Sequence, residues 1–307
     1  HARCAFRASP DMRASLAWPA ASLACIVAVA VLLRRARRRR VSQLTFYDRG
    51  SSNNAARIRL WMYLEGAESA ITIVPVTHAE QRSEEYRSVN PFMKCPALTI
   101  HFSDGSSSWL AEAAIILEYL SDTHRRPWSR RYLPHDPELR AHVRLVVRCH
   151  DLYLASPNCS QPGPFTHTQG CMYVAPPGGK HCTDRWIGRS ERAAKLAECW
   201  KQLDVLHTLL RGPFFAGADL SLADLAVWPT LCFFEFYLPR VFGWGEGALW
   251  HGRPRLLAWY EQHMASLPAA VRVRDELRRS MAAKEATGCL DEIIAETRDE
   301  AFKWVYP

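Results

Sequence analysis

The spacing of hydrophobic residues divides the chain into two regions. Runs of strand length come first, at residues 44–48, 70–76, 97–102 and 107–110. Asp104 and Gly105 form a hairpin turn signal between the last two runs. These runs predict a small sheet, with residues 70–76 at its edge because Pro75 cannot donate a backbone hydrogen bond.

Two helices are predicted within the same region. Asn53 to Leu64 has a helical pattern that ends at Gly66. From Glu112 to Leu120 the apolar residues are too dense for a surface helix, so we expect this helix to pack against the sheet. Beyond Pro137 nearly every segment has a helical pattern. The chain is therefore expected to form an α/β domain followed by an all-helical domain.

The expected organisation has four parts and one insertion. The parts are a hydrophobic N-terminal segment with an Arg-rich flank (1–43), the α/β domain (44–125), the helical domain (136–283) and a C-terminal extension (284–307) with a polar helix over Leu290–Phe302. Residues 156–189 interrupt the helical domain and are rich in Pro, Gly, Thr and Ser, which predicts an inserted surface loop. The spacing of its Cys and His residues matches no structural zinc module, so no metal site is expected.

The N-terminus carries the whole net charge. Residues 1–40 contain nine Arg and one Asp, which accounts for the formal net charge of +8, so the rest is neutral and nucleic acid is not an expected partner. Residues 14–33 are uncharged, long enough to span a bilayer, and followed by six Arg. This order predicts an uncleaved membrane anchor with the folded body in the cytosol. The alternative is a presequence for a plastid or mitochondrion, for which Arg-rich, acid-poor composition is also suitable.

Two residues near the hairpin suggest more than packing. Pro96 precedes the run 97–102, where a proline either begins the strand or, in the cis form, turns the backbone so that Cys95 exposes its N–H and C=O. A ligand with a peptide group would pair with Cys95 like an added strand. Glu112 begins the next helix, where backbone donors and the helix dipole favour anions. Ordinary compensation of that dipole also explains a Glu at this position.

The same stretch resembles the glutathione-binding half of the cytosolic glutathione transferases, in the zeta class or a related one. The chain reads N-P-F-M-K-C-P-A-L from Asn90, then D-G, then E-A-A-I-I-L-E-Y-L from Glu112. A second match, F-F-A-G-A-D-L-S-L-A-D-L, carries the capping box of Ser221 and Asp224 that begins the core helix of the family's helical domain. The resemblance covers about residues 44–281. It implies a thioredoxin-like α/β domain, an all-α bundle, glutathione as co-substrate, no metal, and a homodimer.

The resemblance also implies roles for individual residues. The glutathione-binding residues that it implies are Lys94, Cys95, Pro96, Glu112, Ala113 and Gln81. Cys95 would pair with the cysteinyl backbone of glutathione, and Glu112 with Ala113 would hold its γ-glutamyl end. Ala113 departs from the family pattern, which has Ser there; a lost hydrogen bond to a charged group is worth about 1.5–3 kcal/mol, so weaker glutathione binding is expected. Gln81 stands where the family often contacts the glycyl end, and a solvated loop residue is the alternative interpretation.

The loop after residues 44–48 supplies the candidate catalytic hydroxyl. The sequence S-S-N-N-A-A-R-I-R-L from Ser51 is similar to the S-S-C-S-x-R-V-R-I of the zeta class, which assigns the contact with the glutathione sulfur to Ser52. A hydroxyl there donates to a thiolate while the helix N-terminus lowers the pKa of the thiol. An ordinary helix N-cap is an equally good interpretation of Ser52. Ser51 and Tyr47 are alternative sources of the hydroxyl.

Two functions are consistent with these features. The first is a glutathione transferase-like enzyme, in which the glutathione thiolate attacks a hydrophobic electrophile for conjugation, dehalogenation or isomerisation. The second is a non-catalytic, membrane-anchored member of the family that keeps the fold for binding or regulation. Ala113, the insertion and the hydrophobic N-terminal segment suggest the second function.

Overall fold

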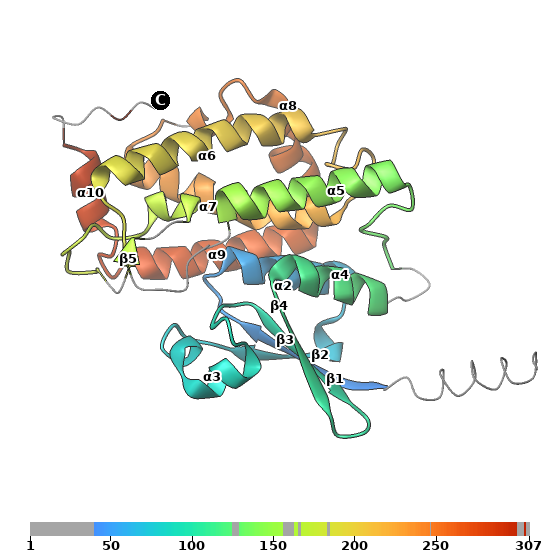
Figure 1. Ribbon diagram of the computed structural model, residues 1–307. Helices are drawn as coiled ribbons and strands as arrows, with labels where there is room; N and C mark the ends of the chain where they lie inside the picture. The colour runs from blue at the N-terminus through green and yellow to red at the C-terminus, as the bar shows by residue number, and fades with distance from the viewer. Residues whose placement is uncertain are drawn as a thin grey trace, which may run out of the picture.

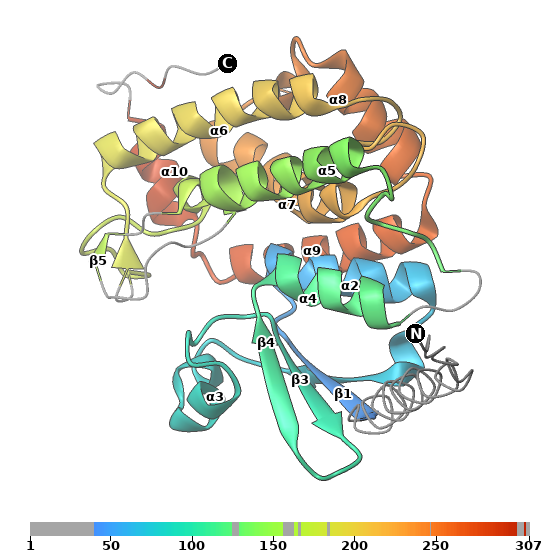
Figure 2. The ribbon, with the colours of Figure 1, turned by 45° about the vertical axis from the view of Figure 1, so that its right-hand side comes forward.

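Two packed domains make up the described part of the chain. The computed structural model describes residues 40–124, 129–155, 163–164, 167–182, 185–245, 247–299 and 304. Helices α2 (Asn53–Glu65) and α4 (Ala113–Thr123) lie between the sheet and the helical domain (Figures 1 and 2). This architecture confirms the expected α/β domain followed by an all-helical domain.

The sheet has four strands in the order β2-β1-β3-β4. They are β1 (Val41–Asp48), β2 (Ile71–Pro75), β3 (Ala97–Phe102) and β4 (Ser107–Ala111). β2 runs parallel to β1 at the edge, as Pro75 predicts, and β3 runs antiparallel to both β1 and β4. β1 begins at Val41, earlier than the expected start at 44. Its first three residues are exposed, so no hydrophobic pattern in the sequence marks them as part of the strand.

The register of the strands determines which connections meet. Tyr47 pairs with Ala97, and Ala97 pairs with Ala111, so the end of β1, the start of β3 and the end of β4 form one row. The peptide bond between Cys95 and Pro96 is cis and immediately precedes this row, while Glu112 immediately follows it. The connection from β1 to α2 and the start of α4 therefore meet at the same end of the sheet.

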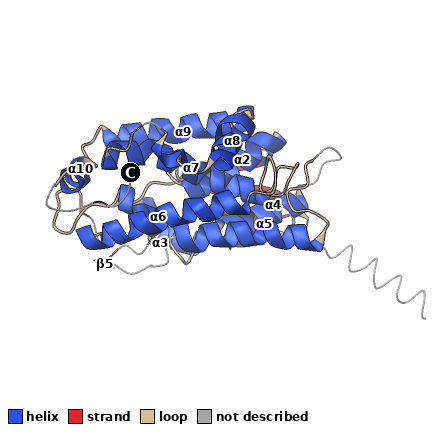
Figure 3. Ribbon diagram, turned by 90° about the horizontal axis from the view of Figure 1, so that it is seen from above, coloured by secondary structure: helices blue, strands red, loops and turns tan. Residues whose placement is uncertain are grey.

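The helical domain is built around α7. Its helices are α5 (Pro137–His150), α6 (Arg189–Leu209), α7 (Leu222–Phe242), α8 (Pro254–Ala258), α9 (Pro268–Glu285) and α10 (Asp291–Thr297), and a short α3 (Glu84–Val89) belongs to the first domain. Seen from above, α7 lies between the pair α5 and α6 and the helix α9 (Figure 3). The predicted capping box of Ser221 and Asp224 begins α7. Asp224 Oδ1 also accepts hydrogen bonds from the Phe215 N–H (3.0 Å) and the Trp259 indole (2.8 Å), so its role is structural.

One described segment of the insertion is part of the core rather than a surface loop. Residues 168–172 form a 3₁₀ helix whose last four residues are buried, and Gly163–Pro164 (β5) pairs with Arg185–Trp186 (β6). The surface-loop prediction is therefore wrong for this part of 156–189. The reason is Arg192 of α6, which is fully buried and donates to the backbone oxygens of three insertion residues, Cys171, Val174 and Ile187.

The C-terminal segment also differs from the prediction. The helix α10 ends at Thr297 instead of Phe302, and it is not a polar extension of the bundle. Leu290 and Ile293 are buried in the main core, and the Thr297 hydroxyl donates to the Val241 carbonyl of α7. The segment is polar on average, but two buried apolar residues among its acidic ones are enough to dock the short helix on α7.

The expected membrane span, residues 14–33, lies outside the described residues. Within the ranges that the structure describes, no helix is both long and apolar enough to cross a bilayer. The membrane anchor and the organelle presequence therefore both stay predictions.

Candidate functional site

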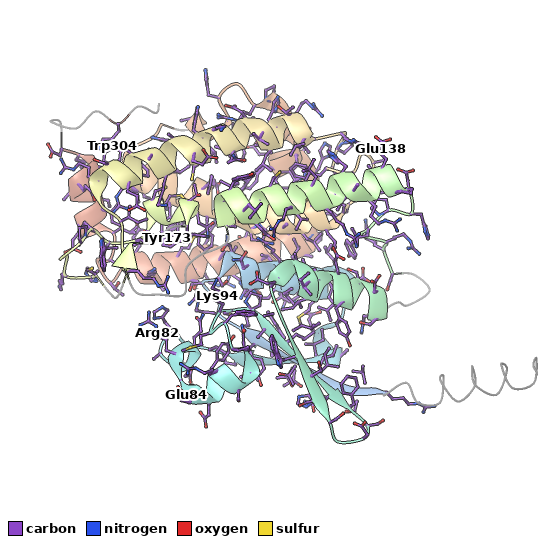
Figure 4. All side chains as sticks on the ribbon, in the orientation of Figure 1. Arg82, Glu84, Lys94, Glu138, Tyr173 and Trp304 are labelled. Atoms are coloured by element: carbon purple, nitrogen blue, oxygen red, sulfur yellow. The ribbon has the colours of Figure 1, made fainter. Side chains whose placement is uncertain are left out.

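A pocket lies at the end of the sheet where β3 begins and β4 ends. Its lining residues come from α2, the segment before β3, the start of α4 and the turn after α5; they are Asn54, Arg57, Asn90, Lys94, Cys95, Pro96, Glu112, Ala113 and Asp151. Figure 4 shows Lys94 at the edge of the first domain that faces the helical domain. Of the predicted glutathione-binding residues, the pocket brings together all except Gln81.

The thiol of Cys95 is not a candidate nucleophile. Its Sγ donates to the Tyr47 carbonyl at 3.4 Å, and burial raises the pKa of the thiol to about 12. The side chain is therefore protonated at neutral pH, whereas nucleophilic attack requires a thiolate. Any contribution of Cys95 to binding comes from its backbone, next to the cis bond to Pro96.

The start of α4 forms one wall of the pocket. Glu112 is the N-cap, with φ +67° and ψ 117°, a conformation that residues other than glycine rarely adopt and that is found most often at functional sites. Its side chain is exposed, whereas Ala113 is buried at the first helical position. The first N–H groups of a helix have no partner within the helix and attract anions. This wall therefore offers backbone donors to an anion, without a hydroxyl at position 113.

The predicted catalytic residues lie outside the lining of this pocket. Ser52 is the N-cap of α2, 5% exposed, and its Oγ accepts a hydrogen bond from the Ala55 N–H at 3.2 Å. That bond uses an oxygen lone pair, so the hydroxyl still has its proton to donate. Ser51 lies half-buried in the preceding turn, and the Tyr47 ring packs edge-on against Tyr86 at 5.9 Å between centroids. The catalytic roles of all three residues stay predictions.

Gln81 supports the loop that precedes α2. Its Oε1 accepts a hydrogen bond from Arg49 Nη1 (2.7 Å), and its Nε2 donates to the Met93 carbonyl (2.7 Å). The solvated-loop interpretation is therefore wrong, because Gln81 is 9% exposed and protein groups occupy both ends of its amide. The predicted contact of Gln81 with the glycyl end of glutathione stays a prediction.

A buried polar cluster beside the pocket was missed in the sequence. Arg57, 1% exposed, donates through Nη2 to Asp151 Oδ1 (2.6 Å) and to His150 Nδ1 (2.9 Å). His150 Nε2 lies 2.8 Å from Thr230 Oγ1 on α7, and Asp151 begins a π-helical turn, Asp151–Ala155, that continues α5. A buried charge needs a partner, but no local pattern in the sequence marks Arg57 as buried, and periodicity does not identify a partner so far along the chain.

The charges in this cluster follow from burial and from Arg57. Burial raises the pKa of Asp151, but the neighbouring guanidinium outweighs this and holds the pKa well below its usual range. Burial, together with the charge of Arg57, lowers the pKa of His150 to about 4. At neutral pH the pocket therefore presents an ionised Asp151 beside Arg57, while His150 is neutral.

The low pKa of His150 predicts a loss of stability in mild acid. The unfolded chain binds a proton at His150 below about pH 6.5, whereas the folded protein leaves it neutral down to about pH 4. Because the unfolded state binds more protons in this window, the contribution of His150 to the free energy of unfolding is complete above about pH 6.5, and about 2–3 kcal/mol of it is lost as the pH drops to about 4. Urea unfolding at about pH 7 and about pH 5 measures this loss.

Two variants separate His150 from the other titrating groups. His150→Gln should remove the part of the pH dependence that His150 contributes and leave the parts contributed by His167, whose pKa burial lowers to about 3, and by His142 and His207, whose pKa values burial also lowers. His251→Gln, at an exposed position, is the control for the replacement of a histidine by glutamine. Equal losses in the original protein and in His150→Gln would show that His150 is not responsible.

Comparisons with known proteins agree with this geometry. Residues 51–123 match the family model described as glutathione S-transferase, N-terminal domain, and residues 189–262 match the model of the C-terminal domain. The chain is 31% identical over 193 residues to probable maleylacetoacetate isomerase 2 of Drosophila melanogaster, covering 62% of this chain and 73% of that protein. It is 27% identical over 194 residues to human glutathione S-transferase theta-2B, covering 63% of this chain and 69% of that protein.

A solved structure shows the same fold. The glutathione transferase of Burkholderia graminis, crystallised with two glutathione molecules per subunit, superposes with a TM-score of 0.58 at 21% identity. The superposition covers 76% of this chain and 88% of that chain. With both domain models matched in order and an isomerase relative matched over most of its length, the chain belongs to the glutathione S-transferase family.

Proposed function

We propose that the protein is a glutathione-dependent enzyme that binds glutathione in the pocket between β3, α4 and Asp151. The observation that carries the proposal is the lining itself, in which the start of a helix, a backbone segment beside a cis proline and two carboxylates surround one pocket. The names of the relatives, which are glutathione transferases and maleylacetoacetate isomerases, support the same co-substrate.

The charges of the pocket suit the γ-glutamyl end of glutathione. This end carries an ammonium and a carboxylate on one carbon, so it needs groups of both kinds close together. The first N–H groups of α4, beginning at Ala113, would bind the carboxylate. The carboxylates of Glu112 and Asp151 would bind the ammonium. The backbone of Cys95 would then pair with the cysteinyl part of glutathione, as an added strand does.

This placement directs the glutathione sulfur toward the N-terminus of α2. The hydroxyl of Ser52 would donate to the thiolate, which lowers the pKa of the thiol and keeps a nucleophile present at neutral pH. In conjugation the thiolate forms a C–S bond with the electrophile, whereas in isomerisation the bond breaks again and glutathione is released unchanged. Because an isomerase is among the matched relatives, isomerisation of an activated double bond is the first reaction to test.

A second candidate function rests on Ala113. If the missing hydroxyl abolishes glutathione binding, the protein is a non-catalytic member of the family that uses the fold for binding or regulation. The two candidates differ in a quantity that is simple to measure, the affinity for glutathione.

Calorimetric titration of glutathione into the full chain tests the proposal, with Ala113→Ser alongside. A hydrogen bond to a charged group is worth about 1.5–3 kcal/mol, so Ala113→Ser should bind glutathione about 10- to 100-fold more tightly. Ala114→Ser, one residue further along α4, is the matched control and should change the affinity little. Binding by the original protein near or below millimolar supports the enzyme; no binding by it, with recovery in Ala113→Ser, supports the non-catalytic alternative.

The implied homodimer stays a prediction, supported by an apolar surface. Large hydrophobic side chains are exposed on β4, α4, α5 and adjoining segments, namely Phe92, Trp109, Ile115, Leu145, Leu152 and Tyr153. α4 and α5 lie on the same side of the molecule (Figures 1 and 2). Such patches mark protein–protein contacts, so sedimentation velocity should show a species of twice the chain's mass. Ile115→Asp should shift it to monomer, and a monomeric original protein at micromolar concentration would contradict the prediction.

A further inference from the structure

We propose that Gln169, in the insertion, is a positioning residue that fixes the catalytic end of α2. Its side chain pairs with Asn53, the residue directly after Ser52, so the insertion sets where the Ser52 hydroxyl lies. The inference rests on the proposed function only for the chemistry at Ser52. The placement of α2 by the insertion is a separate property of the fold.

Gln169 and Asn53 form a reciprocal pair of amides. Asn53 Nδ2 donates to Gln169 Oε1 at 2.9 Å, and Gln169 Nε2 donates to Asn53 Oδ1 at 3.2 Å. The second hydrogen of Asn53 Nδ2 is donated to Thr230 Oγ1 on α7 at 2.7 Å. Both amides are almost fully buried, with exposures of 4% for Asn53 and 2% for Gln169. Because an unpaired buried amide is costly, this pairing fixes both side chains.

Hydrogen bonds from α6 and to α10 hold the described part of the insertion, which carries Gln169 of this pair. Arg192, fully buried on α6, donates to the Cys171 carbonyl (2.7 Å), two residues after Gln169, and to the carbonyls of Val174 (2.9 Å) and Ile187 (3.2 Å). Its Nε donates to Glu296 at 3.2 Å, and the backbone N–H groups of Lys180 and His181 donate to Glu292 of α10. The 3₁₀ helix that carries Gln169 is therefore held by α6, and residues 180–181 are held by α10.

Two sets of hydrogen bonds hold the chain on either side of Ser52. From within the first domain, Arg59 binds both carboxylate oxygens of Asp48 (2.8 and 2.7 Å) and the Gly50 carbonyl (3.1 Å), which fixes the loop before Ser52. From the helical domain, Gln169 and Thr230 hold Asn53 just after it. Without Gln169 the loop stays attached to α2, while the first turn keeps only the bonds of Asn53 to Thr230 and of Asn54 Nδ2 to the Ala155 carbonyl (3.2 Å) among those to the described helical domain. The Ser52 hydroxyl therefore shifts relative to the bound sulfur.

Two measurements on Gln169→Ala test the inference. The first is hydrogen exchange at the Ala55 and Ala56 amides in the first turns of α2, which should become at least about tenfold faster. The second is the pKa of the bound glutathione thiol, followed by ultraviolet absorbance of the thiolate, which should rise by about one unit, with kcat about tenfold lower and KM for glutathione within about twofold. The unequal effect on kcat and KM is expected because the residues assigned to the γ-glutamyl and cysteinyl parts of glutathione, Cys95, Glu112, Ala113 and Asp151, lie on other elements.

Gln202→Ala is the matched control. Gln202 is also buried, and its amide donates to Glu198 on its own helix α6 rather than to α2, so this variant should change neither measurement. The paired exchange Asn53→Gln with Gln169→Asn keeps the combined length of the two amides and should recover part of the kcat that Gln169→Ala loses.

The outcomes separate this inference from the proposed function. Unchanged exchange at Ala55 in Gln169→Ala overturns the inference, whatever the activity. Faster exchange with an unchanged thiol pKa and kcat also overturns it, since the insertion would then hold α2 without acting on the site. If the original protein gives no thiolate signal, the proposed function fails, and faster exchange in Gln169→Ala still supports the placement of α2 by the insertion.

Discussion

Replacing Ser52 by Ala should lower kcat by about 10²- to 10³-fold, the usual effect of removing one donor from a developing or resident negative charge. The structure gives the physical reason. Ser52 Oγ accepts a bond from the Ala55 N–H and keeps its own proton, at the positive end of α2. Steady-state kinetics with glutathione and an activated double bond measures the effect, and KM for glutathione should change little.

Ser52 also caps a helix, so its two roles have to be separated. Ser52→Ala is expected to cost about 1 kcal/mol of stability through the lost cap, whereas glycine at an N-cap costs only a few tenths. Ser52→Gly should therefore remain folded and still lose the rate, and Ser52→Thr, which keeps the hydroxyl, should retain most of it. Ser51→Ala is the neighbouring control. Full activity in both Ser52→Ala and Ser52→Gly would exclude this residue as the thiolate donor.

Replacing Arg192 by Met should lower the free energy of unfolding by about 3–5 kcal/mol, because removing one partner of a buried ion pair leaves the other uncompensated. Arg192 has no exposed surface, and the side chain of Glu296, its partner, is 8% exposed. The variant also leaves the carbonyls of Cys171, Val174 and Ile187 without this donor. Urea unfolding measures the change.

A surface pair between the same elements serves as the comparison. Arg189 at the start of α6 pairs with Asp299 just after α10, and both side chains are more than a third exposed. Arg189→Met should cost less than about 1 kcal/mol, as exposed ion pairs usually do. The double variant Arg192→Met with Glu296→Gln should recover part of the loss, since it removes the uncompensated carboxylate. If Arg192→Met lowers the free energy of unfolding no more than Arg189→Met does, the stabilising role of the buried Arg192 contacts is contradicted.

The parts of the fold that were predicted have local signals. Gly66 ends α2 in the left-handed conformation, and Ser221 with Asp224 caps α7, each within a few residues of the pattern that predicts it. Strands β3 and β4 were likewise marked by a hairpin turn. The insertion was mispredicted because its burial depends on Arg192, which lies outside the insertion on α6. The Pro- and Gly-rich composition of the insertion carries no signal of such contacts.

The candidate site likewise combines residues that have a local signal in the sequence with residues that have none. Lys94 to Pro96 and Glu112 to Ala113 were predicted from the family resemblance, each as a contiguous group that flanks a strand, and the register brings the two groups to one pocket. The pairing of Arg57 with Asp151 joins residues 94 positions apart. Asn53 and Gln169 are 116 positions apart. No periodicity connects such residues, so only the packing of α2 against the helical domain reveals them.

The direction of β1 has a practical consequence for attaching the protein to anything else. The strand begins at Val41 and ends seven residues later at Asp48, one residue beyond the pair of Tyr47 and Ala97 at the pocket end of the sheet. A strand of this length spans roughly 25 Å. A fusion partner or an immobilising tag joined ahead of Val41 is therefore attached at the opposite end of the strand, and molecules tethered in this way should keep the mouth of the pocket accessible to small molecules.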